Sequence, residues 1–282
     1  MRGPANGGGW DFELGARLAY DLNQPLDLSL EYYGGIMSRS LFQKIIAQLE
    51  KTYGRPQLPQ TSDPLEMILF ENVAYLVSDE RRERAFNALR DQIGLKPTDI
   101  LSAPSDKLLE VARMGGMRPE DRADKLQFIA RTVLSEFQGD LRQILKWPVA
   151  RAKKALKKFP GIGDPGAEKI LLFSRTHPIL ALESNGLRAL IRLGFGEELK
   201  NYAATYRSAQ EAVKDQLTSD SVEDYVWLIC AHLLLRRHGQ ELCKRTEPIC
   251  TSCPLTENCR YWRDNSPRLS RGKIGAKPSP KK

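Results

Sequence analysis

Apolar residues recur at helical spacing along most of this chain, and no stretch shows the strict alternation typical of a β-strand. In residues 41–53, for example, Leu41, Ile45, Ile46 and Leu49 fall on one helical face. Similar patterns predict helices over residues 65–77, 79–93, 105–114, 119–136 and 147–158. The run 65–77 is almost entirely apolar, so we expect its helix to be buried on most sides. The pattern predicts an all-α protein.

A tight Pro-Gly-Ile-Gly turn joins two of the predicted helices. Asp164 is suited to cap the second helix and Pro165 to occupy its first position, so that helix should begin at once. Because glycine tolerates positive φ and has no side chain, the backbone N–H groups of Gly161, Ile162 and Gly163 could hold a phosphate. The same turn also serves as a plain connector between helices, and the motif alone does not separate the two uses.

Composition and charge narrow the class of protein. The chain has 282 residues, 41% of them hydrophobic, which is enough for two compact domains or one large one. It has no run of about 18 apolar residues and no secretory signal, so we expect a cytoplasmic, nucleoid-associated protein with no membrane partner. Residues 263–282 carry +6 of the net charge of +8 and suggest a disordered basic tail. Such a tail could attract phosphates or merely add solubility.

Four cysteines lie within seventeen residues, in the spacing C-x6-C-x2-C-x5-C: Cys243, Cys250, Cys253 and Cys259. Four thiolates this close together can ligate one metal centre. Unequal loops suit a cubic iron–sulfur cluster better than a zinc tetrahedron, which usually has two paired CxxC knuckles, but zinc remains the alternative. The fifth, Cys230, lies in an apolar run and is expected to be buried.

Taken together, the hairpin turn and the cysteine spacing resemble the helix-hairpin-helix DNA glycosylases, the superfamily of endonuclease III and the mismatch-adenine glycosylase. His238 and Gly239 also precede Cys243 at the family's spacing, and the resemblance covers about residues 41–262. It implies a bilobed all-α fold with a [4Fe–4S] cluster. Double-stranded DNA would cross the cleft between the lobes, with the target base flipped into it.

The resemblance also implies a division of the chain. Residues 57–177 would form a six-helix domain carrying the hairpin. Residues 38–56 and 178–262 together would form the iron–sulfur cluster domain. An N-terminal extension, partly disordered, would cover 1–37, and the basic disordered tail would cover 263–282.

The chain departs from the family in its candidate catalytic residues. Bifunctional members have a Schiff-base lysine where this chain has Pro165, so we expect no lyase activity through the usual residue. Lys169 lies one helical turn further on and is expected to face elsewhere. The family's catalytic aspartate is matched here by Glu183, which keeps the charge that can stabilise an oxocarbenium-like sugar or activate water. The alternative is that Glu183 only caps the helix that follows it.

A second carboxylate, Glu71, interrupts the apolar run of residues 65–77. Its position matches that of the catalytic glutamate in the adenine-specific branch of the superfamily. Burial would raise its pKa and suit it to protonate a leaving base; alternatively, it is a buried glutamate paired with an arginine. Between the first two cysteines, Lys244 and Arg245 resemble the family's DNA-contacting loop, although each could be simply solvated.

We therefore predict a monomeric base-excision-repair enzyme that flips a damaged or mismatched base and hydrolyses its N-glycosidic bond without lyase chemistry. The alternative is a catalytically inactive DNA-binding protein that retains the fold and the cluster. A third reading, an iron–sulfur electron carrier, leaves the hairpin unexplained.

Overall fold

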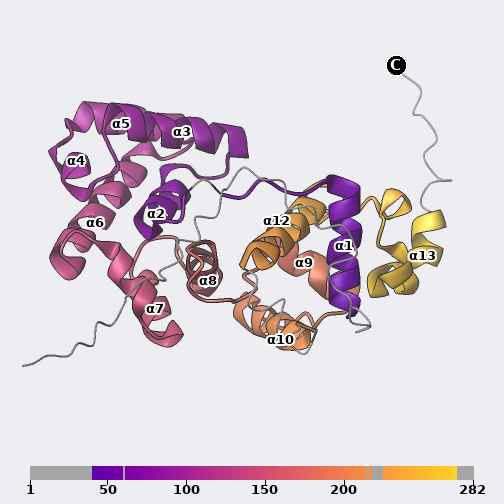
Figure 1. Ribbon diagram of the computed structural model, residues 1–282. Coiled ribbons are helices and arrows are strands. Elements are labelled where there is room, and N and C mark those ends of the chain that lie inside the picture. The colour runs from indigo at the N-terminus through magenta and orange to yellow at the C-terminus, as the bar shows by residue number, and fades with distance from the viewer. Residues whose placement is uncertain (1–39, 60, 215, 218–224, 272–282) are drawn as a thin grey trace, which may run out of the picture. The chain divides into compact units, whose positions relative to one another are not determined.

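A computed structural model describes residues 40–59, 61–214, 216–217 and 225–271. The predicted N-terminal extension, 1–37, and the end of the predicted tail, 272–282, lie outside these ranges. The described residues form helices and one isolated bridge between Tyr75 and Gly116, so the all-α prediction is confirmed (Figure 1). None of the helices described is long and apolar enough to cross a bilayer.

The described helices gather around two hydrophobic cores. The first core takes its buried residues from the segment 65–171, and the second takes them from 42–49 and 172–259. The helices of the first are α2 (Pro64–Val73), α3 (Asp79–Gln92), α4 (Pro97–Ser102), α5 (Ser105–Met114), α6 (Pro119–Phe137), η1 (Leu141–Lys146), α7 (Val149–Leu156) and α8 (Asp164–Phe173). Those of the second are α1 (Leu41–Tyr53), α9 (Ser184–Leu193), α10 (Tyr202–Lys214), α12 (Tyr225–Glu241), η2 (Cys250–Ser252), η3 (Thr256–Asn258) and α13 (Arg260–Arg271). The predicted domain boundaries themselves stay a prediction.

Helix α2 begins where the sequence predicts and ends earlier. The Asp63 side chain accepts hydrogen bonds from two N–H groups of the first turn, and Pro64 occupies the first position. The helix stops at Val73 because the chain then turns to pair with another loop, where the N–H of Tyr75 donates to Gly115 O at 3.1 Å. Tyr75 and Leu76 are 60% and 73% exposed, so the expected burial of the whole run to residue 77 is wrong.

In the second core, α9 and α12 pack closely against each other. The approach depends on Gly239 of α12, because a Cβ there would lie 2.4 Å from the backbone oxygen of Asn185 on α9. Cys230 is buried on the same helix, as expected. This contact places the helix that precedes the cysteine cluster against the start of α9, where Glu183 lies.

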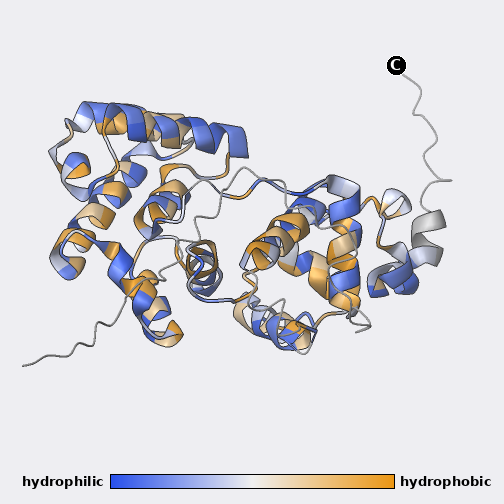
Figure 2. Ribbon diagram, viewed as in Figure 1, coloured by the Kyte–Doolittle hydropathy of each residue, from blue (hydrophilic) through white to orange (hydrophobic). Residues whose placement is uncertain are grey.

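Helix α13 corrects the predicted tail. It extends to Arg271, so residues 263–271, which we expected to be disordered, are helical. The helix is anchored because Tyr261 and Trp262 pack against the second core, and Arg263 N–H donates to Cys259 O at 3.2 Å. In Figure 2 the coloured part of α13, residues 260–266, is largely hydrophilic. Helix α3 is also largely hydrophilic, as the charged pattern of residues 79–93 predicts.

Candidate functional site

The hairpin turn between α7 and α8 presents two exposed glycines. Gly161 has φ +75°, a conformation that favours glycine, and Gly163 caps α8. Within the described chain their N–H groups have no protein acceptor, whereas Ile162 is buried and its N–H donates to Phe159 O at 3.2 Å. Two of the three predicted phosphate-binding N–H groups are therefore available to an anion at a helix N-terminus.

Asp164 does not cap α8 as we expected. Gly163 takes the cap position, and Asp164 begins the helix itself. Its carboxylate pairs with Lys153 of α7 at 3.4 Å and with Lys157, which follows the end of α7, at 3.0 Å. The hydrogen bond from Lys157 is the main reason that the pKa of Asp164 is lowered. The expectation is wrong because the ion pairs draw this side chain away from the helix N–H groups.

A buried asparagine supports the hairpin from the neighbouring helix α2. The side-chain N–H₂ of Asn72 donates to Ile68 O at 3.0 Å and to Pro160 O at 2.9 Å. Because a buried amide needs such partners, Asn72 ties the turn to the first core. Our sequence reasoning missed this residue, although a polar side chain in an apolar helix was the available signal.

Glu71 lies beside Asn72 but points to charged partners. It forms an ion pair with Lys169 of α8, and Arg82 of α3 lies 3.7 Å away. Burial raises the pKa of this carboxyl, but Lys169 and Arg82 outweigh burial and the net pKa is lowered. The expected raised pKa is therefore wrong. Lys169, one turn beyond Pro165, faces Glu71. The catalytic role of Glu71 stays a prediction.

Glu183 caps α9, which was the alternative to a catalytic role in the sequence analysis. Its Oε1 accepts from the N–H of Gly186 at 2.5 Å and its Oε2 from the side-chain amide of Asn185 at 2.8 Å. The carboxylate is partly exposed, and its negative charge contributes, after burial, to raising the pKa of Tyr202 to about 12. A carboxylate ordered by two hydrogen bonds is compatible with both a cap and a catalyst, so the catalytic role stays a prediction.

Arg188 links this carboxylate to the cysteine cluster. It donates to Asn185 Oδ1 at 2.8 Å, to Gly239 O at 2.7 Å and to Cys243 O at 3.0 Å. Asn185 and Arg188 thus hold Glu183, the end of α12 and the first cysteine together.

The four cysteines line one small pocket of about 20 Å³, all as free thiols. As their side chains stand, no group of three or more His, Cys, Asp or Glu in the described ranges is arranged to hold a metal ion. The donor set nevertheless fits a four-thiolate cluster. Arg192 Nη1 lies 3.4 Å from Cys243 Sγ, and Leu255 N–H donates to Cys253 Sγ at 3.5 Å. N–H groups directed at sulfur are the contacts that stabilise cluster thiolates.

Arg192 also organises the loop between the first two cysteines. Its guanidinium donates to Lys244 O at 2.6 Å and to Arg245 O at 3.0 Å. The side chains of Lys244 and Arg245 are exposed, as contact with DNA requires, so both residues remain candidates for DNA binding. Our sequence reasoning missed Arg192, whose spacing of four residues from Arg188 on one helix face was the available signal.

A groove of about 480 Å³ opens between α9, the start of α10 and this loop. Its lining includes four cationic residues and one acidic residue, Glu198: the cations are Arg188, Arg192, Lys200 and Arg245. Ser184, which follows Glu183, and Tyr202 also line it. The candidate catalytic carboxylate therefore lies at the edge of a groove whose charge favours a phosphate.

No protein-family model matches the chain. Endonuclease III of Rickettsia conorii is 31% identical over 166 residues, which are 59% of this chain and 70% of the relative. The chain belongs to the endonuclease III family.

Endonuclease III of Sulfolobus acidocaldarius is 26% identical over 183 residues, 64% of this chain and 74% of that protein. A solved structure of a trapped endonuclease III–DNA covalent intermediate superimposes with a TM-score of 0.61 at 20% identity, covering 80% of this chain and 98% of the other. The predicted bilobed helix-hairpin-helix fold is thereby confirmed, and with it the resemblance to this superfamily of DNA glycosylases.

Proposed function

We propose that this member of the endonuclease III family is a DNA N-glycosylase that hydrolyses the bond between a damaged or mismatched base and its sugar. The observation that carries the proposal is the setting of Glu183. Its carboxylate is oriented by Gly186 and Asn185, and the next residue, Ser184, lines a cationic groove. A fixed negative charge beside a phosphate-binding groove suits the chemistry of a sugar that develops positive charge.

DNA phosphates are held at two places. The N–H groups of Gly161 and Gly163, which have no acceptor among the described residues, bind one at the start of α8. The groove beside α9 binds another, because Arg188 and Arg192 line it. Among the described residues, their hydrogen bonds go to carbonyl and amide oxygens and to a cysteine sulfur rather than to carboxylates. Exposed Lys244 and Arg245 add to this interface. Binding is to double-stranded DNA, and one nucleotide is extruded to reach Glu183.

At the extruded nucleotide, Glu183 stabilises the oxocarbenium-like sugar or takes a proton from the attacking water. Its two hydrogen bonds keep the carboxylate in one orientation. The carboxylate is therefore already oriented for the reaction before the nucleotide binds.

The leaving base is protonated at the Lys169–Glu71 pair. An ionised Glu71 does not donate a proton, and the lowered pKa of this carboxyl keeps it ionised at neutral pH. We therefore assign Lys169 rather than Glu71 to the leaving base, and Glu71 orients it through their ion pair. This reverses the role that a raised pKa would have assigned to Glu71.

The reaction ends at an intact abasic strand, because Pro165 stands where bifunctional members carry the Schiff-base lysine. Borohydride should trap no covalent complex between this protein and abasic-site DNA. A trapped complex would overturn the monofunctional proposal, and its loss in Lys169→Ala would identify a replacement nucleophile.

A [4Fe–4S] cluster would be ligated by Cys243, Cys250, Cys253 and Cys259, and zinc is the less fitting occupant. When bound it supplies a covalent tie between the end of α12 and α13, which restrains the intervening basic loop. Nothing in the proposed hydrolysis depends on electron transfer. We propose that the protein acts on DNA as a monomer.

The test is base release from duplexes containing uracil, thymine–guanine, adenine–8-oxoguanine, alkylated and oxidised bases. Release by the cluster-loaded protein is scored before and after alkali, beside Glu183→Gln and the control Glu211→Gln. Glu211 is an exposed α10 residue whose ion pair among the described residues is with Lys214 at 3.7 Å. We expect strand breaks only after alkali, and their loss in Glu183→Gln alone. Absence of release from every duplex would refute glycosylase activity.

A second candidate function has one observation in its favour. Both oxygens of Glu183 are already engaged, one as the cap of α9 and the other by the Asn185 side-chain amide, as in a protein that keeps the fold only to bind DNA. Tight binding to these duplexes without base release would favour this non-catalytic function.

A further inference from the structure

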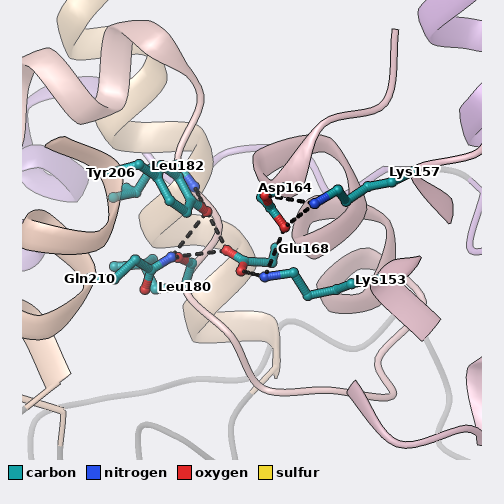
Figure 3. Close-up of polar contacts among 8 residues, drawn as sticks. All are labelled: Lys153, Lys157, Asp164, Glu168, Leu180, Leu182, Tyr206 and Gln210. Carbon is teal, nitrogen blue, oxygen red and sulfur yellow. Dashed lines mark hydrogen bonds and ion pairs between the residues drawn. The ribbon is translucent and has the colours of Figure 1, made fainter. Parts of the chain in front are cut away.

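A buried carboxylate on the hairpin helix α8 connects that helix to the segment ahead of Glu183. Glu168 is only 7% exposed, and both of its carboxylate oxygens have a hydrogen-bond or ion-pair partner. Its Oε1 pairs with Lys153 of α7, and its Oε2 accepts from the hydroxyl of Tyr206 and from Gln210 at 3.2 Å (Figure 3). The four side chains come from α7, α8 and α10, so the contact bridges the hairpin and a helix of the second core.

The network also reaches the backbone of residues 180–182, the segment that precedes Glu183. Gln210 donates to Leu180 O at 2.6 Å, and the hydroxyl of Tyr206 accepts from Leu182 N–H at 3.4 Å (Figure 3). Leu182 is the residue immediately before Glu183. Two side chains therefore hold, from opposite ends, the short extended segment that delivers the carboxylate to the start of α9.

The protonation states of the network are defined by its contacts. Burial and then the charge of Glu168 raise the pKa of Tyr206, so its hydroxyl stays protonated and donates. Partial burial lowers the pKa of Lys153, but the hydrogen bond and charge of Glu168 outweigh it and the net pKa is raised. Burying a charge is costly compared with apolar packing, and it is tolerated only when every partner is in place. A fully paired network of this kind allows one relative arrangement of the elements it joins.

We propose that Glu168, Tyr206 and Gln210 are positioning residues that hold the segment ahead of Glu183 in register with the hairpin helix. A phosphate bound at the start of α8 and the carboxylate at the start of α9 are then kept at one separation. The inference rests on the proposed glycosylase function, because only there does the position of Glu183 affect a rate. None of the three side chains is proposed to touch DNA.

The test uses Tyr206→Phe, which removes one hydroxyl and keeps the ring, with Glu211→Gln on the same helix as the matched control. Base release is followed in single turnover with excess cluster-loaded protein, and binding to the same duplex is measured separately. We expect the rate constant of Tyr206→Phe to fall about tenfold, since displacements of the order of 1 Å can have such effects. The dissociation constant and the reaction amplitude should stay within about twofold of those of the unaltered protein.

A purely structural role gives a different result. Partial unfolding lowers the amplitude and leaves the rate constant of the folded fraction unchanged, whereas displacement of Glu183 lowers the rate constant. An unchanged rate constant in Tyr206→Phe would overturn the inference while leaving the glycosylase function intact.

A second measurement does not depend on activity. Amide hydrogen exchange in residues 180–186 should be faster in Tyr206→Phe than in Glu211→Gln, because Leu182 N–H loses its acceptor. Equal exchange in the two variants would overturn the inference even if the unaltered protein released no base. Failure of the proposed function alone would appear as absence of base release together with the expected difference in exchange.

Discussion

His232 should make the folded protein sensitive to acid. The side chain is almost fully buried on α12, where Nδ1–H donates to Ala181 O at 2.8 Å and the ring meets Phe173 edge-on. Burial is the main reason that the pKa of His232 is lowered to about 4; the charges of Lys169 and Arg236 add to the shift, while the hydrogen bond to Ala181 and the charge of Glu71 oppose it.

The sign and size of the effect follow from the two pKa values. The pKa of histidine is about 6.5 in the unfolded state and about 4 in this folded protein. Between these values the unfolded state binds more protons, so acid favours unfolding. With about 1.4 kcal/mol per unit of separation, the free energy of unfolding should fall by about 2 kcal/mol between pH 7 and pH 5 through this residue alone. Above pH 7 the residue contributes almost no pH dependence.

The assay is chemical denaturation of the full chain at several pH values from 5 to 8. Acid also protonates other groups and can release a bound cluster, so the informative quantity is the difference from His232→Asn. In that variant the amide can donate in place of Nδ1–H but does not titrate in this range. We expect a shallower fall in the free energy of unfolding for His232→Asn. Parallel curves for the two proteins would refute the assignment of a buried neutral histidine.

Three further predictions concern packing and ligation. Asn72→Ala should lower the free energy of unfolding by about 1–3 kcal/mol in denaturant titrations, because Pro160 O loses its buried donor; a change below about 0.5 kcal/mol would contradict this. Gly239→Ala should cost about 2 kcal/mol or more in the same assay, since its Cβ would lie 2.4 Å from a backbone oxygen of α9, and a neutral result would mean that the helices separate easily. Cys253→Ala should lose the bound iron measured after purification and Cys230→Ala should retain it; equal iron in both would contradict the proposed ligand set.

Local features of this protein were predictable from sequence because they depend on neighbours along the chain. The start of α2 needs only Asp63 and Pro64, whose cap and first position are set within one helical turn. The four cysteines lie within seventeen residues, so a short loop suffices to bring them to one pocket. The all-α class follows from the same cause, since the 3.6-residue pattern is read within single segments.

The direction of the pKa shift of Glu71, by contrast, was decided by the tertiary structure. Glu71 sits in an apolar run, and burial alone would raise its pKa, but Lys169, 98 residues away in the chain, lowers it. Glu168 likewise finds its hydroxyl partner 38 residues away, and Arg192 reaches carbonyl groups more than fifty residues later. Electrostatic free energy depends on distance in space and on burial, and both are set only when the helices pack.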